Sequence, residues 1–290
     1  MDESRYSRNI ALFGEEGQRK ITATRVAIVG LGGLGSHVAQ QLAYLGVVRY
    51  GLIDDDVITG SSLNRVVGAL PQDVGAETPK VRSAERLIKS VQPGATVDIL
   101  EGRVTRSSDD AAAELIRKTD VVFGCLDRES PRLFLTGLCS NFKITYFDLA
   151  TDTGGEDEDW YGGRVVYCDG SRCLSCLGLL DQRLIRLEQM TEAELENERR
   201  IYGLSGDLLG RTGPAIVSVN GVVASMAVTE FMAHVTGIRQ AAPQLVYRGD
   251  IPRVTVSKDA GRAGCPYCSR WETLAVTDPA VDGAEAVRPQ

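Results

Sequence analysis

The stretch from Arg25 to Asp56 constrains the fold of this chain more than any other part of the sequence. Residues 25–29 form an apolar run that is too short for a helix, and a cluster of glycines follows it. A segment with helical spacing comes next, before a second apolar run at residues 50–53 that ends in three aspartates. This order predicts a strand, a tight turn, a helix and a second strand.

The glycine cluster indicates how the turn is used. Gly30, Gly32 and Gly35 fit the pattern G-x-G-x-x-G, with Gly33 between them. In this pattern glycines permit the turn, let backbone N–H groups approach a phosphate and allow close packing of the helix, whose N-terminus attracts anions. Asp54 follows about 20 residues later, where a carboxylate accepts hydrogen bonds from ribose hydroxyls. The turn therefore predicts a nucleotide site, either NAD or ATP, with a merely structural turn as the alternative.

A polar loop at residues 57–68 follows the acidic strand end and contains Arg65. Ligands bind at the carboxyl ends of parallel strands, so this loop is placed to line the nucleotide site. The planar guanidinium of Arg65 suits a phosphate. Lys80 opens the next helical segment, and we expect no nearby acid to pair with it. Its ammonium group is then either simply exposed or a phosphate contact.

Residues 120–127 form another buried apolar run, which ends at Asp127. Asp54 and Asp127 are thus two carboxylates at strand ends. On one edge of a sheet they could hold the ribose and Mg²⁺ respectively, because this hard cation prefers carboxylate and phosphate oxygens. The alternative is that Asp127 caps the helix that begins near Pro131.

Two C-x-x-C pairs indicate a metal site, and they consist of Cys173, Cys176, Cys265 and Cys268. Each pair can present two thiolates to one tetrahedral ion, so together they predict a structural Zn²⁺ site without an open coordination position. The metal would clip the C-terminal part of the chain back onto the rest of the fold. Redox-active or unpaired cysteines are the alternatives.

Size and composition exclude several classes of protein. A chain of 290 residues, 43% hydrophobic and 24% charged, forms one large α/β domain or two smaller ones. The net charge of −7 argues against a nucleic-acid partner, which usually requires a basic surface. Residues 215–235 are apolar, but Asn220 and Glu230 within them favour a buried core helix over a membrane span. The N-terminus lacks the apolar region of a signal peptide, so we expect a cytoplasmic protein without a membrane partner.

The chain divides into four regions by sequence: a helical N-terminal arm (1–24), a nucleotide-binding half (25–150), a C-terminal half with both cysteine pairs (151–270) and a disordered tail (271–290). Residues 151–159, which are rich in glycine and acid, should form an exposed loop. Further strands are expected at 96–100, 144–149, 163–167, 245–248 and 253–256, and further helices at 80–91, 108–118 and 184–202.

These motifs give the sequence a resemblance to the ThiF/MoeB group of the ubiquitin-activating-enzyme superfamily, which are ATP-dependent adenylyltransferases. The resemblance extends from residue 5 to residue 268. It depends on the following motifs in order: Arg5-Tyr6-x-Arg8, Gly30-x-Gly32-Gly33-x-Gly35, Asp54-x-Asp56, Ser61-x-Leu63-Asn64-Arg65, Pro79-Lys80, Cys125-x-Asp127 with Arg132, and both cysteine pairs.

The resemblance implies an α/β protein with a Rossmann-like ATP-binding fold, a mixed sheet and a zinc-clipped C-terminal part. It assigns Asp54 to the ribose and Asp127 to Mg²⁺. The implied ATP-binding residues are Gly30, Gly32, Gly33, Gly35, Asp54, Asp56, Ser62, Asn64, Arg65, Lys80 and Asp127. The implied catalytic residues are Arg8, Arg65, Lys80 and Asp127, which would neutralise pyrophosphate as it leaves. By sequence alone Arg8 looks like part of a solvated face, whereas the resemblance places it at the ATP of a partner subunit in a homodimer.

Two departures from the family pattern change what we expect. Ser62 stands where the family usually has Asn. The serine side chain is a shorter donor, so it weakens one nucleotide contact or passes that contact to Asn64. The crossover loop at residues 202–211, which carries the thioester cysteine in many members, contains no cysteine here. Cys125 and Cys139 lie in core-like patterns, so Cys168, in loop-like surroundings, is the remaining candidate thiol acceptor.

The implied activity is activation of the C-terminal carboxylate of a ubiquitin-like or sulfur-carrier protein ending in Gly-Gly. The product is an acyl-adenylate, which then passes to a sulfur-donor or conjugating protein. Three other functions stay open: adenylation of a peptide or tRNA-borne carboxylate, a NAD-dependent dehydrogenase, and an inactive scaffold that binds ubiquitin-like proteins. The acidic net charge argues against tRNA, and a dehydrogenase gives no use to Arg8, Arg65 and Lys80 together.

Overall fold

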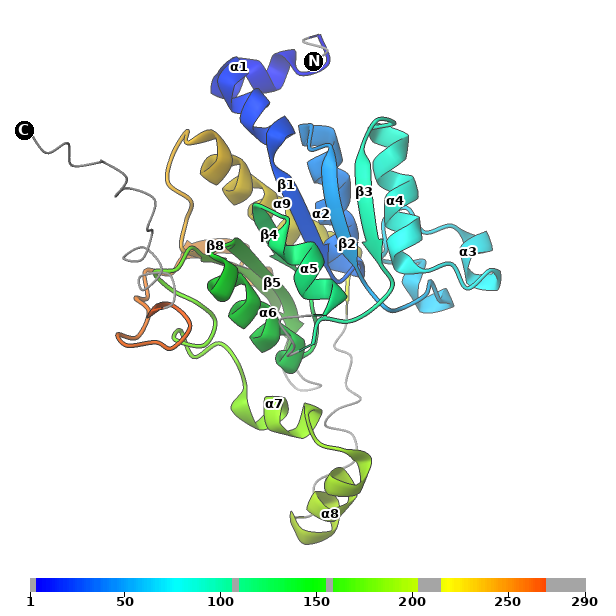
Figure 1. Ribbon diagram of the computed structural model, residues 1–290, viewed down its shortest axis with the longest axis vertical. Coiled ribbons are helices and arrows are strands. Elements are labelled where there is room, and N and C mark those ends of the chain that lie inside the picture. Colours follow the sequence, from blue (N-terminus) through cyan, green and yellow to red (C-terminus); the bar gives the residue numbers. More distant parts are fainter. Residues whose placement is uncertain (1–3, 106–109, 155–158, 203–214, 270–290) are drawn as a thin grey trace, which may run out of the picture.

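A single mixed sheet of eight strands runs through the protein in the order β3-β2-β1-β4-β5-β6-β7-β8 (Figure 1). The computed structural model describes residues 4–105, 110–154, 159–202 and 215–269. The first five strands in this order are parallel, and β6, β7 and β8 continue the sheet antiparallel. The strands are β1 (Arg25–Val29), β2 (Arg49–Ile53), β3 (Thr96–Leu100), β4 (Val121–Gly124), β5 (Thr145–Thr153), β6 (Tyr161–Cys168), β7 (Gln244–Arg248) and β8 (Arg253–Val256). The predicted mixed α/β fold is confirmed.

Helices cover both faces of the sheet (Figure 1). Helices α2, α4 and α9 pack on one face, and α5 and α6 pack on the other. The helices are α1 (Ser7–Ala23), α2 (Gly33–Leu45), α3 (Pro71–Gly75), α4 (Lys80–Val91), α5 (Ala111–Arg117), α6 (Glu129–Phe142), α7 (Gln182–Glu188), α8 (Glu192–Tyr202) and α9 (Val217–Thr236), with a 3₁₀ turn at Gly60–Ser62. The two helical layers make β1 a central, doubly covered strand.

Strand β1 shows why the first apolar run has this composition. Val26 and Ile28 belong to the core under α2 and α9, whereas Ala27 and Val29 belong to the core under α5 and α6. Successive side chains of a strand point to opposite faces, so a strand covered on both faces needs apolar residues throughout.

Helix α9 is the core helix predicted at residues 215–235. Val223, Ala224 and Phe231 are fully buried, and the buried Glu230 is paired with Arg239 at 2.6 Å. None of the helices within the described ranges has the length and apolarity needed to cross a membrane.

The structure corrects the bounds of two predicted elements. The helical segment at 184–202 is two helices, α7 and α8, which are separated at residues 189–191. Strand β5 continues to Thr153, across the predicted division at residue 150, because β6 pairs with it from Tyr146 to Thr153. The division of the chain at residue 150 stays a prediction. Residues 151–153 of the predicted loop belong to β5, and residues 155–158 lie outside the described ranges.

Candidate nucleotide-binding site

The glycine turn after β1 passes very close to the neighbouring backbone. Gly30 has a φ of +86°, and its N–H donates to the Ile53 carbonyl at 2.9 Å. A Cβ added at Gly30 would lie 2.5 Å from the Cys125 carbonyl oxygen, and one added at Gly35 would lie 1.9 Å from the Gly30 oxygen. Gly30 and Gly35 are therefore required by the fold itself.

Gly32 differs, because a Cβ added there would meet no heavy atom within 4 Å. Gly32 is also the N-cap residue of α2, which has neither a side-chain cap nor an acid in its first turn. The first N–H groups of a helix lack partners within the helix, and the helix dipole favours an anion beside them. The open backbone at Gly32 and the uncapped end of α2 thus fit a phosphate group.

Asp54 follows β2 and holds the glycine turn in place. Its carboxylate accepts the Leu31 N–H at 2.5 Å and the Asp56 N–H at 2.8 Å. Burial raises the pKa of Asp54, although Lys80 and the two backbone donors act against this rise. A carboxylate has about four acceptor positions, so each oxygen can still accept a ribose hydroxyl.

Lys80 has an acid partner, so the expectation that no acid lies near its ammonium group is wrong. Its Nζ is 2.7 Å from Asp56 Oδ2, and its side chain is only 15% exposed. The Lys80 N–H also donates to the Asp56 carbonyl at 2.9 Å, beside a short β-bridge between Val57 and Pro79. This pairing joins segments far apart in sequence, which local sequence patterns do not reveal. It fixes the ammonium group beside the acidic end of β2.

The loop between β2 and α4 positions three further predicted residues. Ser62 is buried, and its Oγ accepts the Thr59 N–H at 3.1 Å, so its side chain stabilises the 3₁₀ turn. Asn64 is exposed. Arg65 is partly buried and donates to the Ser61 carbonyl. The 3₁₀ turn thereby places Asn64 and Arg65 in the loop that follows the carboxyl end of β2.

Asp127 lies just beyond β4, at the same edge of the sheet as Asp54, because β1 pairs in parallel with both β2 and β4. The capping alternative is wrong, since the N-cap residue of α6 is Arg128. Asp127 is exposed and makes no side-chain hydrogen bond or ion pair within the described ranges. Its carboxylate is therefore available to a ligand or a cation.

Arg8 lies at the opposite end of the sheet. Its neighbour Asn9 donates to the Leu45 carbonyl at 3.4 Å, and Tyr6 accepts from Gln92 Nε2 at 2.5 Å. Leu45 ends α2 and Gln92 follows α4, so this part of α1 is far from the glycine turn at the start of α2 (Figure 1). Arg8 is exposed, and within the described part of the chain it lies away from the predicted nucleotide site.

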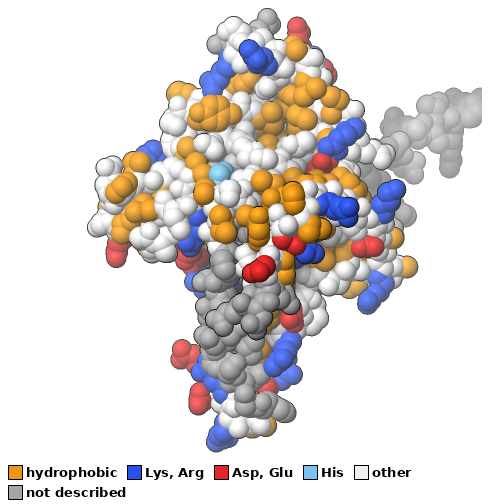
Figure 2. Space-filling view, turned by 180° about the vertical axis from the view of Figure 1, so that it is seen from behind, with side chains coloured by type: hydrophobic (Ala, Val, Ile, Leu, Met, Phe, Trp, Pro, Cys, Tyr) orange, Lys and Arg blue, Asp and Glu red, His pale blue; other side chains and the backbone are white. Residues whose placement is uncertain are grey.

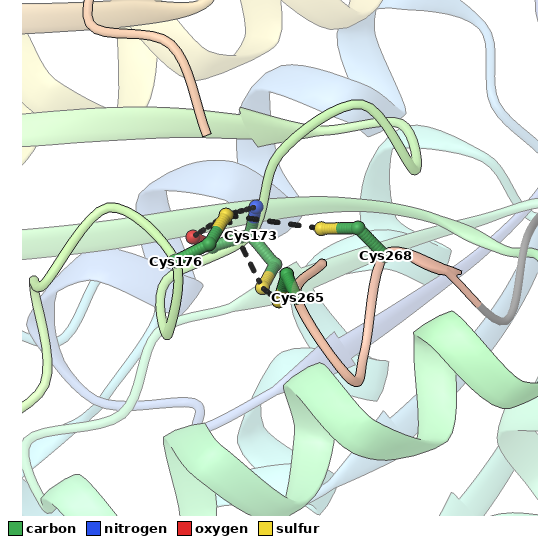
Figure 3. A group of neighbouring side chains, drawn as sticks. All are labelled: Cys173, Cys176, Cys265 and Cys268. Carbon is green, nitrogen blue, oxygen red and sulfur yellow. Dashed lines mark hydrogen bonds between the residues drawn. The ribbon is translucent and has the colours of Figure 1, made fainter. Parts of the chain in front are cut away.

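The four predicted zinc ligands lie together (Figure 3). The Sγ atoms of Cys173 and Cys265 are 3.6 Å apart, and Cys176 Sγ is 3.8 Å from the Sγ atoms of both Cys173 and Cys268. Tetrahedral Zn²⁺ with bonds of about 2.3 Å places its sulfur ligands about 3.8 Å apart. The donor set and its spacing therefore fit Zn²⁺.

Cys168 lies in a strand, so the expectation that its thiol has loop-like surroundings is wrong. It is the last residue of β6 and is 6% exposed, and burial raises the pKa of its thiol. The thiolate is the reactive form, so a buried thiol with a raised pKa is a poor acceptor. Cys139 is also buried, as predicted for a packing residue.

Comparison with known proteins agrees with this geometry. Residues 6–260 match the ThiF family over most of the chain. The chain belongs to the ThiF family. Sulfur carrier protein ThiS adenylyltransferase of Escherichia coli is 26% identical over 273 residues, covering 92% of this chain and 95% of that protein.

Other relatives are more similar to this chain over a shorter stretch. The SAMP-activating enzyme E1 of Haloferax volcanii is 38% identical over 137 residues, 47% of this chain and 49% of that protein. Molybdopterin-synthase adenylyltransferase of Haemophilus influenzae is 34% identical over 145 residues, 49% of this chain and 58% of that protein. The chain thus spans about half the length of these curated relatives. Among solved structures, E. coli MccB with ATP has the same fold, with a TM-score of 0.68 at 19% identity over 92% of this chain and 75% of MccB.

Two features of this ThiF-family chain were missed from sequence. Arg132 of α6 and Asp148 of β5 form a buried ion pair, with Nε 3.1 Å from Oδ1. Asn220 of α9 lies against Gly33, where a Cβ would be 2.2 Å from Asn220 Nδ2. The only sequence signal was a polar residue inside an otherwise apolar run, at Asp148 and at Asn220.

Proposed function

We propose that this chain is an ATP- and Mg²⁺-dependent adenylyltransferase that activates the C-terminal carboxylate of a ubiquitin-like or sulfur-carrier protein. The observation that carries the proposal is one edge of the sheet, where an open glycine turn meets two carboxylates and two cations. The carboxylates are Asp54 and Asp127, and the cations are Arg65 and Lys80. The names of the relatives, which include adenylyltransferases for ThiS and for molybdopterin synthase, support this chemistry.

The proposed reaction joins a substrate carboxylate oxygen to the α-phosphorus of ATP. The bond from that phosphorus to the bridging oxygen of pyrophosphate breaks, and the electron pair leaves with pyrophosphate. Arg65 and Lys80 stabilise the charge that develops on the leaving group, and Asp54 holds the ribose. Asp127 would hold Mg²⁺, which when bound supplies further neutralisation of phosphate charge. Little covalent work by the protein is required.

ATP–pyrophosphate exchange tests the proposal directly. We expect exchange that requires Mg²⁺ and one member of a panel of ubiquitin-like proteins ending in Gly-Gly. In the Asp127→Ala variant exchange should fall by about a hundredfold, because a cation ligand is lost. Glu114→Ala, which removes an exposed carboxylate on α5, is the matched control and should retain full exchange.

Other outcomes of this experiment separate the alternative functions. Exchange with a short peptide, but with none of the proteins, would favour a peptide substrate. MgATP binding without exchange would favour a scaffold. Full exchange by Asp127→Ala would contradict the proposed role of Asp127.

The proposed fate of the acyl-adenylate is transfer to a separate sulfur-donor or conjugating protein. The crossover loop contains no cysteine, and all of it except Tyr202 lies outside the described residues. Cys168 is buried in β6, so it does not supply an acceptor. We further propose that the protein acts in the cytoplasm, because cysteine thiols are kept reduced there and can bind zinc, and because the reaction requires ATP.

We further propose a homodimer in which Arg8 reaches the ATP of the partner subunit. Leu12 follows Arg8 by one helical turn and is 59% exposed, so a cation and an apolar side chain share one uncovered face of α1. Ile216, Val217 and Val222 add exposed apolar side chains at the start of α9. Hydrophobic side chains also gather below the α1 end of the molecule in Figure 2. A second copy of the chain would cover these apolar side chains.

Mixing two inactive variants tests the arrangement in trans. Arg8→Ala and Asp127→Ala should each lose exchange alone, whereas an equal mixture after subunit exchange should recover about a quarter of the wild-type rate. Half of the dimers are then mixed, and each has one intact site. Arg19→Ala, on the same helix but paired with Glu16, is the control and should keep full activity. An inactive mixture that contains mixed dimers would contradict the arrangement.

A further inference from the structure

Asn220 is a buried residue that the proposed mechanism does not use. It lies in the first turn of α9 and is 1% exposed. Its Oδ1 accepts a hydrogen bond from Thr151 Oγ1 at 3.2 Å. Its amide nitrogen Nδ2 is also buried, and it has no acceptor within the described ranges. Buried amide groups nearly always have hydrogen-bond partners, so this N–H₂ group points to an acceptor that the described residues do not supply.

The free N–H₂ group is aimed at the glycine turn. A Cβ added at Gly33 would lie 2.2 Å from Asn220 Nδ2 and 3.7 Å from Arg65 Cδ. Gly33 is the first residue of α2, whose N-cap residue Gly32 provides no side-chain cap. Three kinds of donor thus surround the start of α2: its own uncapped backbone N–H groups, the side chain of Arg65 and the amide of Asn220. All of them suit a phosphate oxygen.

We propose that Asn220 is a further nucleotide-binding residue, whose Nδ2 donates to a phosphate oxygen held at the N-terminus of α2. This inference rests on the proposed function, because ATP supplies the phosphate. Thr151 donates to Oδ1 and so keeps the N–H₂ side of the amide toward the turn. Asn220 comes from α9 and Thr151 from the end of β5, so the contact couples the C-terminal half of the sequence to the nucleotide on the N-terminal half.

MgATP binding and stability without nucleotide, measured together, test the proposal. Asn220→Leu has nearly the same shape but lacks the donor. Its Kd for MgATP, measured by calorimetry without an acceptor protein, should rise about tenfold. Its melting temperature without nucleotide should be equal to or above that of the wild type, because a buried N–H₂ group without a partner has been removed. Asn220→Asp should bind MgATP even more weakly, since a carboxylate repels phosphate.

Two more variants sharpen the test. Thr151→Val removes the hydrogen bond that orients the amide, and its Kd should rise by a smaller factor, about threefold. Ser225→Ala, further along α9, removes an exposed hydroxyl that donates to the Gly221 carbonyl of the same helix at 2.7 Å, and the Kd of this variant should not change.

Three outcomes would overturn the inference. If Asn220→Leu bound MgATP as tightly as the wild type, the proposed function would stand and only the role of Asn220 would fail. Weaker binding together with a lower melting temperature in both Asn220→Leu and Thr151→Val would assign Asn220 to the folding core instead. Absence of MgATP binding by the wild-type chain would overturn both this inference and the proposed function.

Discussion

Replacing Asp148 by leucine should destabilise the fold by about 3 kcal/mol, because the buried guanidinium of Arg132 loses its buried acid partner and keeps only Glu129, at 2.9 Å on its own helix. Asp148 is 0% exposed and Arg132 is 4% exposed. Arg132 donates to both carboxylate oxygens of Asp148, and Tyr146 donates its hydroxyl to Asp148 Oδ1 at 2.7 Å. One substitution therefore removes the acceptor of three hydrogen bonds. Urea unfolding followed by circular dichroism measures the loss.

The double variant Arg132→Met/Asp148→Leu is the decisive comparison. An apolar pair of similar volume should recover most of the lost stability, because neither charge is then buried alone. Asp250→Leu breaks the pair of Asp250 with Arg248, in which two hydrogen bonds of 2.7 and 2.9 Å join a partly exposed carboxylate to an exposed guanidinium. This control should change stability little, since exposed pairs contribute little. If Asp148→Leu proved as mild as this control, the buried pair would not hold α6 on β5.

The same pair gives the fold an acid-sensitive component. Burial raises the pKa of Asp148, but the charge and hydrogen bonds of Arg132 outweigh it, so the pKa lies below its ordinary value. The stabilisation by ionised Asp148 is complete above about pH 3.9, the pKa of an aspartate in the unfolded chain. It is lost as the pH falls through the lower pKa of Asp148 in the folded protein. The difference in stability between the wild type and Asp148→Leu should therefore shrink on acidification.

This pair also bears on the proposed magnesium position. Asp127 lies between the end of β4 and the start of α6. Arg132 holds the first turn of α6 to β5, and Glu188 accepts the N–H groups of Glu129 and Ser130 at 3.2 and 2.7 Å. Asp127 is thus exposed but bounded on both sides by fixed elements. We expect Asp148→Leu to weaken exchange as well as stability, whereas the double variant should recover stability more fully than activity.

Most of the fold could be predicted from sequence because strands β1, β2 and β4 are buried on both faces. A short apolar run such as residues 25–29 has few alternatives once a glycine turn and a helical segment follow it. The same reasoning placed Asp54 and Asp127 at one edge, since parallel neighbouring strands bring their carboxyl ends together. Local sequence patterns were therefore sufficient to predict the elements whose structure is determined by consecutive residues.

Pairings between distant segments could not be predicted in the same way. The contacts of Lys80 with Asp56 and of Asn220 with Gly33 depend on how separate elements approach each other. Cys168 looked like a loop residue because a polar turn follows it, but pairing of β5 with β6 extends the strand through it. Arg132 and Asp148 each fitted a local pattern, a helix start and a strand, and only the packing of α6 on the sheet joins them. Long-range geometry decides which polar residues become partners.

Replacing Cys268 by serine should abolish stoichiometric zinc binding and detach the segment that follows β8. Besides the cysteine cluster, a few contacts within the described residues anchor that segment, among them the Ser257 N–H, which donates to the Gln244 carbonyl at 3.0 Å. Arg172 Nη1 donates to the Asp259 carbonyl at 3.1 Å, and Tyr267 lies 3.5 Å from the position of a Cβ at Gly137 on α6. The four side chains of β8 are themselves exposed. Zinc should therefore supply most of the energy that holds residues 257–268, and its loss should cost at least about 3 kcal/mol of stability.

Zinc content, thermal unfolding and limited proteolysis check this expectation together. Reduced wild-type protein should contain one zinc ion per chain, and a strong chelator should lower the melting temperature and expose residues 257–268 to cleavage. Cys125→Ala alters a cysteine outside the cluster and should keep one zinc ion per chain. A protein that contained no zinc when freshly purified under reducing conditions would contradict the metal site.

The response to a reductant distinguishes zinc from disulfides. A disulfide requires sulfur atoms about 2.05 Å apart, whereas the Sγ atoms of Cys173 and Cys265 are 3.6 Å apart, the spacing of two ligands on one tetrahedral ion. A zinc site predicts protection that a chelator removes and a reductant does not. Two disulfides predict the reverse. The segment after β8 should thus become sensitive to protease on chelation alone, because removal of the ion takes away the bonds that join Cys265 and Cys268 to Cys173 and Cys176.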